Sequence, residues 1–161
     1  MGFFNTITMK NLNDLLLQIE NAIPHLEKQN TTISQATVGW QLDHSLLVIN
    51  GIVLQLSKSN PLNYKWRFNL NRTYIQCRNA IPRGKAKAPK QVSPVDILSM
   101  EDLQNKLATA KNNMALLEKL HKNSYFRHPY FGDLNLKAAV WFLKLHTRHH
   151  LKIVNDIINQ G

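Results

Sequence analysis

The sequence predicts an all-α protein, a four-helix bundle with a long crossover between the second and third main helices. Apolar residues recur at helical spacing along four long stretches, and no stretch shows the apolar-polar alternation of a half-buried strand. A length of 161 residues suits one domain. Residues 1–161 are therefore treated as a single bundle, with residues 58–98 as its crossover.

The first helix is expected over residues 9–23, where five apolar side chains fall on one helical face. They are Leu12, Leu15, Leu16, Ile19 and Ile23. Pro24 should end this helix, because proline lacks a backbone N–H and its ring clashes with the preceding turn. Residues 38–58 predict a second helix that is apolar almost all round, which indicates burial. Ser34 or Thr37 could cap it.

The third and fourth main helices follow the crossover. Residues 99–122 predict the third, and Ser99 and Asp102 have the spacing of a capping box at its start. Residues 123–135 contain proline and glycine and are expected to form a turn. The last helix is expected over residues 136–159.

The positive charge of the chain is concentrated in the crossover. The formal net charge is +10, from 20 basic and 10 acidic residues. Nine of the basic residues lie between Lys58 and Lys90, where there is no aspartate or glutamate. Because the rest of the chain is nearly neutral, the excess belongs to one connecting segment. That segment has no clean period, and only a short helix near residues 70–80 is expected in it.

Two histidines occupy core positions of the last helix. Its inward positions alternate in steps of four and three residues, which is the seam of a helix in a bundle. They hold Ala139, Leu143, His146, His150, Ile153 and Ile157. Residues four apart on a helix have Cβ atoms about 5–6 Å apart, so His146 and His150 could bind one metal ion. The alternative is a pair of core-edge histidines that are hydrogen-bonded to carbonyl groups or water.

A metal site needs a third ligand, and His44 is the best candidate. It lies in the second helix, which is strongly apolar, and Gly51 further along the same helix would leave room beside it. Asp43 adjoins it, but neighbouring helical residues point about 100° apart, so Asp43 is not expected to be a ligand. No His-Glu-x-x-His motif occurs, which leaves a zincin-type peptidase without support.

These segments resemble a known family. The stretch "GWQLDHSLLVI" is similar to the Trp-x-x-x-His segment of the DinB/YfiT-like metal-binding four-helix proteins. The stretch "HPYFGDLNLKAAVWFLKLHTRHHLKIVNDI" resembles the closing segment of one branch of that superfamily, with a His-Pro-x-Phe-Gly turn before a His-x-x-His-His helix. The resemblance implies a three-histidine site formed by His44, His146 and His150, whereas His149 is not normally a ligand in this family.

The resemblance also implies a chemistry. The site would hold a divalent transition metal, nickel or zinc, and family activities include thiol-dependent transfers and metal-dependent hydrolysis. A low-molecular-weight thiol is therefore expected as a co-substrate. Three neutral imidazoles leave an open coordination position on a metal, which suits activation of either water or a thiolate. The sequence does not choose between S-transfer and hydrolysis, and it identifies no catalytic residue beyond the ligands.

The basic crossover admits two further interpretations. It could attract an anionic small-molecule substrate toward the metal, with Arg83, Lys85 and Lys87 as binding residues beside Trp40. It also mixes basic residues with aromatic ones, as single-stranded nucleic-acid surfaces do. Nucleic acid is the less favoured partner. A non-catalytic, stress-related protein that binds metal or nucleic acid on the same fold is the alternative function.

Composition also bears on location. One cysteine, Cys77, excludes an internal disulfide framework and suits a reducing compartment. No secretory signal is recognised at the start, and no apolar run approaches the ~20 residues of a membrane span. A cytoplasmic protein that does not enter a membrane is expected. Such bundles commonly dimerise, so a homodimer stays open.

Overall fold

The computed structural model describes residues 3–83 and 99–160, with side chains from residue 11 onward. This part of the chain is mostly helical, with a small two-stranded sheet. The long helices are α1 (Phe3–Ala22), α2 (Val38–Lys58), α4 (Met100–Lys119) and α5 (Leu136–Gln160). The short elements are α3 (Leu70–Arg78), strands β1 (Tyr125–His128) and β2 (Gly132–Asn135), and 3-10 turns at Ile23–His25 and Pro61–Asn63. No described helix is both long and apolar enough to cross a membrane.

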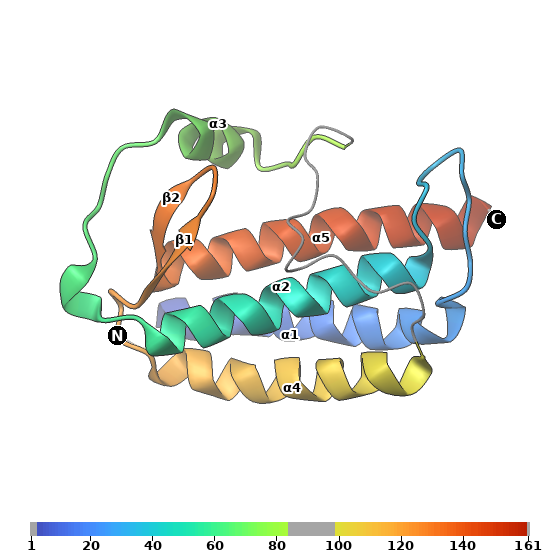
Figure 1. The fold of residues 1–161 in the computed structure, drawn as a ribbon, viewed down its shortest axis with the longest axis horizontal. Coiled ribbons are helices and arrows are strands. Elements are labelled where there is room, and N and C mark those ends of the chain that lie inside the picture. Colours follow the sequence, from blue (N-terminus) through green and yellow to red (C-terminus); the bar gives the residue numbers. More distant parts are fainter. Residues whose placement is uncertain (1–2, 84–98, 161) are drawn as a thin grey trace.

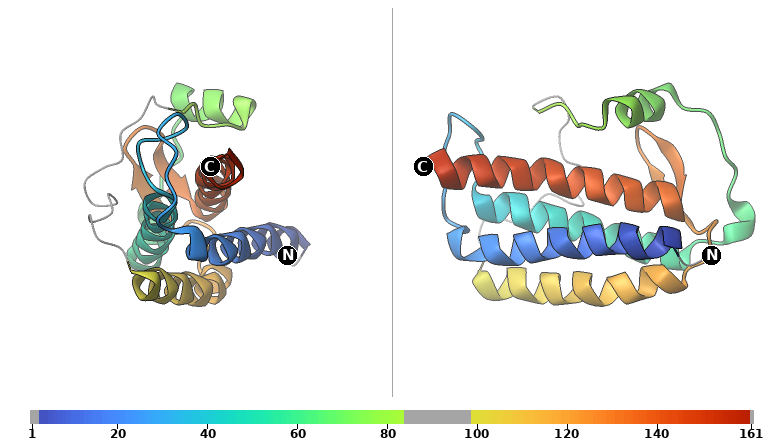
Figure 2. Two further views of the ribbon diagram at one scale, coloured as in Figure 1. Left: turned by 90° about the vertical axis from the view of Figure 1, so that its right-hand side faces the viewer. Right: turned by 180° about the vertical axis from the view of Figure 1, so that it is seen from behind.

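The four long helices lie side by side (Figure 1). Their buried apolar side chains form one core. Helices α1 and α2 each pack against both α4 and α5, as the end-on view also shows (Figure 2). Burying one leucine or isoleucine contributes about 1.5–3 kcal/mol to folding. The largest fully buried side chains come from all four helices and from β2: Leu12, Leu16, Ile19, Leu42, Leu46, Ile49, Leu56, Leu103, Leu117, Leu134, Leu143 and Ile157.

The predicted helix boundaries are largely confirmed by capping hydrogen bonds. Helix α1 ends at Ala22, and Pro24 lies in the 3-10 turn that follows. The Thr37 hydroxyl accepts a hydrogen bond from the Trp40 backbone N–H at 3.2 Å and so caps α2. At the start of α4, Ser99 and Asp102 form a complete capping box. These contacts satisfy backbone N–H groups that the first helical turn leaves without partners.

The turn predicted over residues 123–135 is a β-hairpin, which corrects the all-α fold class. Strands β1 and β2 are antiparallel, and Phe126 is paired with Leu134. Both side chains are buried against the helices. Four-residue strands are too short to show a convincing alternation, which explains why the sequence pattern does not reveal them. Gly132 has φ of +69° at the start of β2, a conformation that glycine adopts without strain.

Helix α3 confirms the short helix predicted near residues 70–80, and it is tied to the hairpin. The Asn69 amide donates a hydrogen bond to the Tyr130 carbonyl at 3.1 Å. The Arg72 guanidinium donates to the Arg67 carbonyl at 2.5 Å and to the Asp133 carbonyl at 3.5 Å. These contacts leave Arg72 buried, so this basic residue of the crossover has a structural role.

Candidate metal centre

Three histidines meet where α2 and α5 pack together. His44 comes from α2, and His146 and His150 come from α5, one helical turn apart. One imidazole nitrogen from each lies within 4.8 Å of the other two. His44 is buried, and the other two are half-buried. The fold therefore brings together the three residues that the sequence identifies as candidate ligands, and they could hold one metal ion.

The nitrogen spacing fits a single ion. His146 Nε2 lies 3.2 Å from His44 Nε2 and 3.2 Å from His150 Nε2. Imidazole nitrogens bound to zinc at about 2.0–2.1 Å, in tetrahedral geometry, are separated by roughly 3.3 Å. Hydrogen bonds alone suit the cluster less well, because one neutral imidazole has a single N–H and cannot donate from Nε2 to two neighbours at once.

A glutamine orients one of the candidate ligands. His150 Nδ1 donates a hydrogen bond to Gln41 Oε1 at 2.6 Å, and Gln41 Nε2 in turn donates to the Ser34 hydroxyl at 3.1 Å. This arrangement places the His150 proton on Nδ1 and leaves the lone pair of Nε2 directed at the cluster. Metal-binding histidines usually have such an outer partner. The sequence offered no signal for Gln41, because the contact spans two helices.

Aromatic rings and apolar side chains enclose the cluster. The Trp40 ring stacks on His44 with a centroid distance of 5.1 Å and an interplanar angle of 15°. Phe142 lies one turn before His146, with ring centroids 5.4 Å apart.

Asp43, next to His44 in the chain, faces α4 and pairs with Lys106 at 2.5 Å. As expected from helical geometry, Asp43 is not part of the histidine cluster.

Burial favours the neutral form of His146 and His150. It holds the pKa of His146 well below its usual range, and positive charge on His44 would lower that pKa further. Burial likewise lowers the pKa of His150, with a further contribution from His146. A neutral imidazole is the form that binds a metal, so these shifts favour metal binding at neutral pH.

We expect the metal-free protein to lose stability as the pH falls below about 6.5, the usual histidine pKa. Below that pH the unfolded chain takes up protons on His146 and His150, whereas the folded chain does not. The unfolded state then binds more protons, so the free energy of unfolding falls by about 1.4 kcal/mol per pH unit for each such histidine. His128 adds to this loss down to its lowered pKa of about 4.

Urea unfolding with a chelator present, at several pH values from 7.5 to 5, measures this slope. A His128→Phe variant should show a shallower dependence, because it lacks one of the shifted histidines. A free energy of unfolding that stays constant over this range would contradict the burial of neutral imidazoles.

Replacing Gln41 by leucine should weaken zinc affinity by about 10–100-fold, the usual effect of removing an outer partner of a metal-binding histidine. The variant Gln41→Glu is the matched control, because its carboxylate still accepts the proton on His150 Nδ1. Competition with a chromophoric chelator measures both affinities. Equal losses in the two variants would mean that the Gln41 contact does not orient His150.

A large cleft opens onto the histidines. Its volume is about 960 Å³, within the range of small-molecule sites. Helices α2, α3 and α5, the hairpin and the segment that follows α3 all contribute to its wall. The three clustered histidines line it together with His149 and Trp40. Burial lowers the pKa of His149, as does the nearby Arg83, while a hydrogen bond with the Ile81 backbone opposes the shift.

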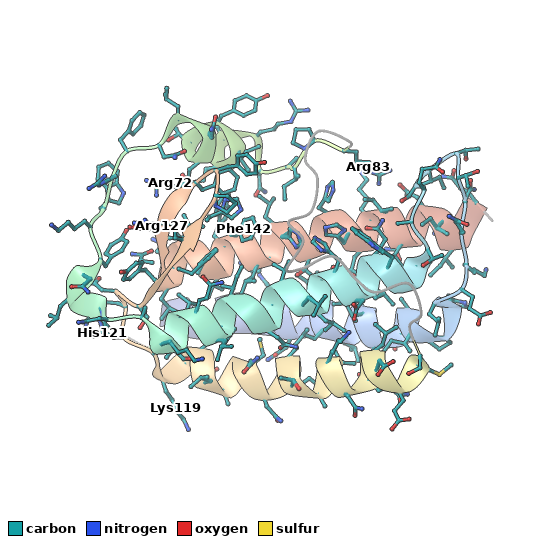
Figure 3. All side chains as sticks on the ribbon, viewed as in Figure 1. Arg72, Arg83, Lys119, His121, Arg127 and Phe142 are labelled. Atoms are coloured by element: carbon teal, nitrogen blue, oxygen red, sulfur yellow. The ribbon has the colours of Figure 1, made fainter. Side chains whose placement is uncertain are left out.

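The predicted substrate-binding residues fall into two groups. Trp40 and Arg83 both line the cleft. Arg83 follows α3 and lies over α5 (Figure 3). Its guanidinium pairs with the Asp156 carboxylate at 2.6 Å. Lys85 and Lys87 lie outside the described residues. The structure thus places Trp40 and Arg83 at the cleft, and a role for any of the four in substrate binding stays a prediction.

His128 is a cleft residue that the sequence pattern assigned only to a turn. Its Nδ1 accepts hydrogen bonds from the backbone N–H groups of Tyr130 and Phe131, at 3.1 and 3.2 Å. The neutral ring therefore carries its proton on Nε2. It stacks on Phe131 at 4.2 Å and meets Phe142 edge-on at 4.6 Å. The aromatic residues that follow His128 in "HPYF" were the only feature of the sequence that could have indicated its place in an aromatic cluster.

Comparisons with family models, with curated proteins and with solved structures found no match to this chain. The resemblance to the DinB/YfiT-like proteins therefore stays a prediction. The functional argument depends on the geometry of the cluster and of the cleft.

Proposed function

We propose that this chain is a metal-dependent enzyme in which His44, His146 and His150 hold one divalent transition metal, zinc or nickel. In this proposal the four long helices form a DinB-like four-helix bundle, and the cleft takes a small-molecule substrate. The reaction is either thiol-dependent S-transfer or hydrolysis. We place the enzyme in the cytoplasm. In the S-transfer reaction it would use a low-molecular-weight thiol as co-substrate.

The observation that carries this proposal is the convergence of the three Nε2 atoms in the lining of a large cleft. Burying three imidazoles around one point is costly unless a shared partner satisfies them, because each unsatisfied polar group costs about 1–3 kcal/mol. A cluster that opens onto a cleft of substrate size is also accessible to a reacting molecule. Both features are typical of a catalytic metal site more than of a closed structural one.

The residues present fit such a metal. Three neutral nitrogen donors without a carboxylate suit zinc or nickel. When bound, the ion would supply a Lewis acid with an open position that can activate water or a thiolate near neutral pH. The chain itself orients His150 through Gln41, places the indole of Trp40 against His44, and encloses the cluster with apolar side chains. His128 lines the same cleft and carries its proton on Nε2.

Activity assays after metal reconstitution test the enzymatic part of the proposal. Protein loaded with zinc or nickel is incubated with thiols and electrophiles, and loss of free thiol is measured. A parallel screen uses aryl and alkyl esters and amides. We expect turnover that needs the metal and is absent from His146→Ala. Stoichiometric metal binding without turnover in either screen would favour a metal-binding protein that has no catalytic role.

One observation favours a second candidate, a non-catalytic protein that binds single-stranded nucleic acid. Three aromatic side chains of the basic segment are largely exposed: Trp66 at 66%, Phe68 at 64% and Tyr74 at 59%. Exposed aromatic rings among basic residues can stack on unpaired bases. Arg72 is committed to structural contacts, which reduces the charge available for this role.

A gel shift with single-stranded oligonucleotides at two salt concentrations tests the second candidate. Binding through phosphates should weaken steeply with salt, because neutralised phosphates release counterions. Trp66→Ala should weaken binding further if base stacking contributes. No shift at low salt would rule out this function.

A further inference from the structure

The wall of the cleft is mostly apolar. Its described lining includes Val48, Ile52, Phe126, Phe131, Phe142 and Ile153. These side chains come from α2, the hairpin and α5, and all six also belong to the main core. They are therefore held in place by packing and form a preorganised surface beside the histidines. A surface of this kind binds apolar groups without first having to order its own side chains.

The same wall carries little unbalanced charge. Among the described residues that line the cleft there is no aspartate or glutamate, and the cations are Arg83 and Arg127. Each is already paired with a carboxylate, Arg83 with Asp156 at 2.6 Å and Arg127 with Asp133 at 2.9 Å. His128 also lines the cleft, and burial keeps it from holding a proton as readily as a free histidine does. A charged group on the body of a ligand would therefore find no unpaired counter-charge among these residues.

Gly51 opens the wall in the middle of α2. A Cβ atom built on this residue would meet nothing within 4 Å, although Gly51 lines the cleft. Glycine in a helix interior is destabilising relative to alanine, so the fold gives up stability at this position. This glycine leaves extra space in the cleft two helical turns along α2 from His44. A larger side chain would project into the cleft and would not disturb the core.

We propose that the cleft binds a small molecule with a predominantly apolar body and one metal-binding polar end, which is directed at the three histidines. The proposal rests on the metal site described under the proposed function. It deepens that function because it describes the substrate: the body is apolar, and any negative charge is on the end that binds the metal. Gly51 sets the size of the apolar body that the cleft accepts.

A homologous series of straight-chain alkanehydroxamic acids, from four to ten carbons, tests the proposal with the zinc-loaded protein. The hydroxamate binds zinc, and the chain extends along the wall. Isothermal calorimetry should show the Kd falling by about three- to fourfold for each added CH2 that enters the cleft. In Gly51→Leu the longest members should bind at least about tenfold more weakly. Ser57→Leu, which adds the same side chain at an exposed position of α2, should behave as wild type.

Zinc stoichiometry is measured first, in all three proteins, so that the two proposals can fail separately. Full zinc binding with a Kd independent of chain length would overturn the apolar body and leave the metal site intact. Equal or tighter binding of chains that end in a carboxylate would also overturn it and would favour Arg83 as an anion site. If wild type takes up no zinc, both proposals fail. Unchanged binding of long chains by Gly51→Leu would overturn the role of Gly51.

Discussion

His146→Ala is expected to lower the affinity for zinc or nickel by more than about a hundredfold, beyond the usual effect of losing an outer partner. His146 is the central member of the cluster, because its Nε2 lies 3.2 Å from both of the other Nε2 atoms. Without it, His44 and His150 supply only two protein ligands, fewer than the three typical of a catalytic zinc site. Competition with a chromophoric chelator measures the affinity.

The matched control for this variant is His149→Ala. His149 is on the same helix and lines the same cleft, but it is not a member of the cluster. The control should keep wild-type affinity, and circular dichroism should show both variants folded. If the two substitutions weaken metal binding equally, the metal is held elsewhere. If neither weakens it, the three-histidine site is wrong.

Lys106→Met should lower the free energy of unfolding by about 1–3 kcal/mol, because it leaves the buried Asp43 carboxylate without its partner, although the Lys106 side chain itself is 30% exposed. Asp43 is 1% exposed in its side chain and has Lys106 as its ion-pair partner at 2.5 Å. Its other carboxylate oxygen is buried without a hydrogen-bond partner among the described residues. Methionine preserves much of the aliphatic stem of lysine, so the variant removes chiefly the charge. Urea denaturation at pH 7.5 measures the loss.

Two further variants test whether the loss of stability comes from leaving a buried charge unpaired or from removing any ion pair. Lys111 lies on the same helix as Lys106 and forms an exposed ion pair with Glu20. Lys111→Met should lower the free energy of unfolding by less than about 1 kcal/mol. The double variant Asp43→Leu, Lys106→Met removes both charges and should recover most of the stability that the single variant loses. If Lys106→Met lowers the free energy of unfolding by less than about 1 kcal/mol, the ion pair with Lys106 is not what stabilises the buried Asp43 carboxylate.

Much of the helical framework could be predicted from the sequence, because long helices leave periodic patterns. The positions of Leu12, Leu16 and Ile19 in the core follow from spacing alone. The capping box at Ser99 is equally local. The hairpin was missed because its strands are four residues long, and its stability comes from Phe126 and Leu134 reaching a core made by distant helices. No local pattern contains that information.

The candidate site was predictable where it depends on one helix and less so where it depends on two. The pairing of His146 with His150 follows from their spacing of four residues, and His44 was inferred from the burial of its helix. Gln41 and His128 were not identified, because each acts through contacts that only the packed helices and the hairpin create. The pairing of Arg83 with Asp156 is likewise a long-range contact.

Metal content, measured by inductively coupled plasma mass spectrometry on protein purified without chelator and without a nickel column, tests the central claim most directly. The three-histidine site predicts close to one equivalent of zinc or nickel per chain, lost in His44→Ala, His146→Ala and His150→Ala. Protein that contains no transition metal, and takes up none when zinc or nickel is added, would contradict it.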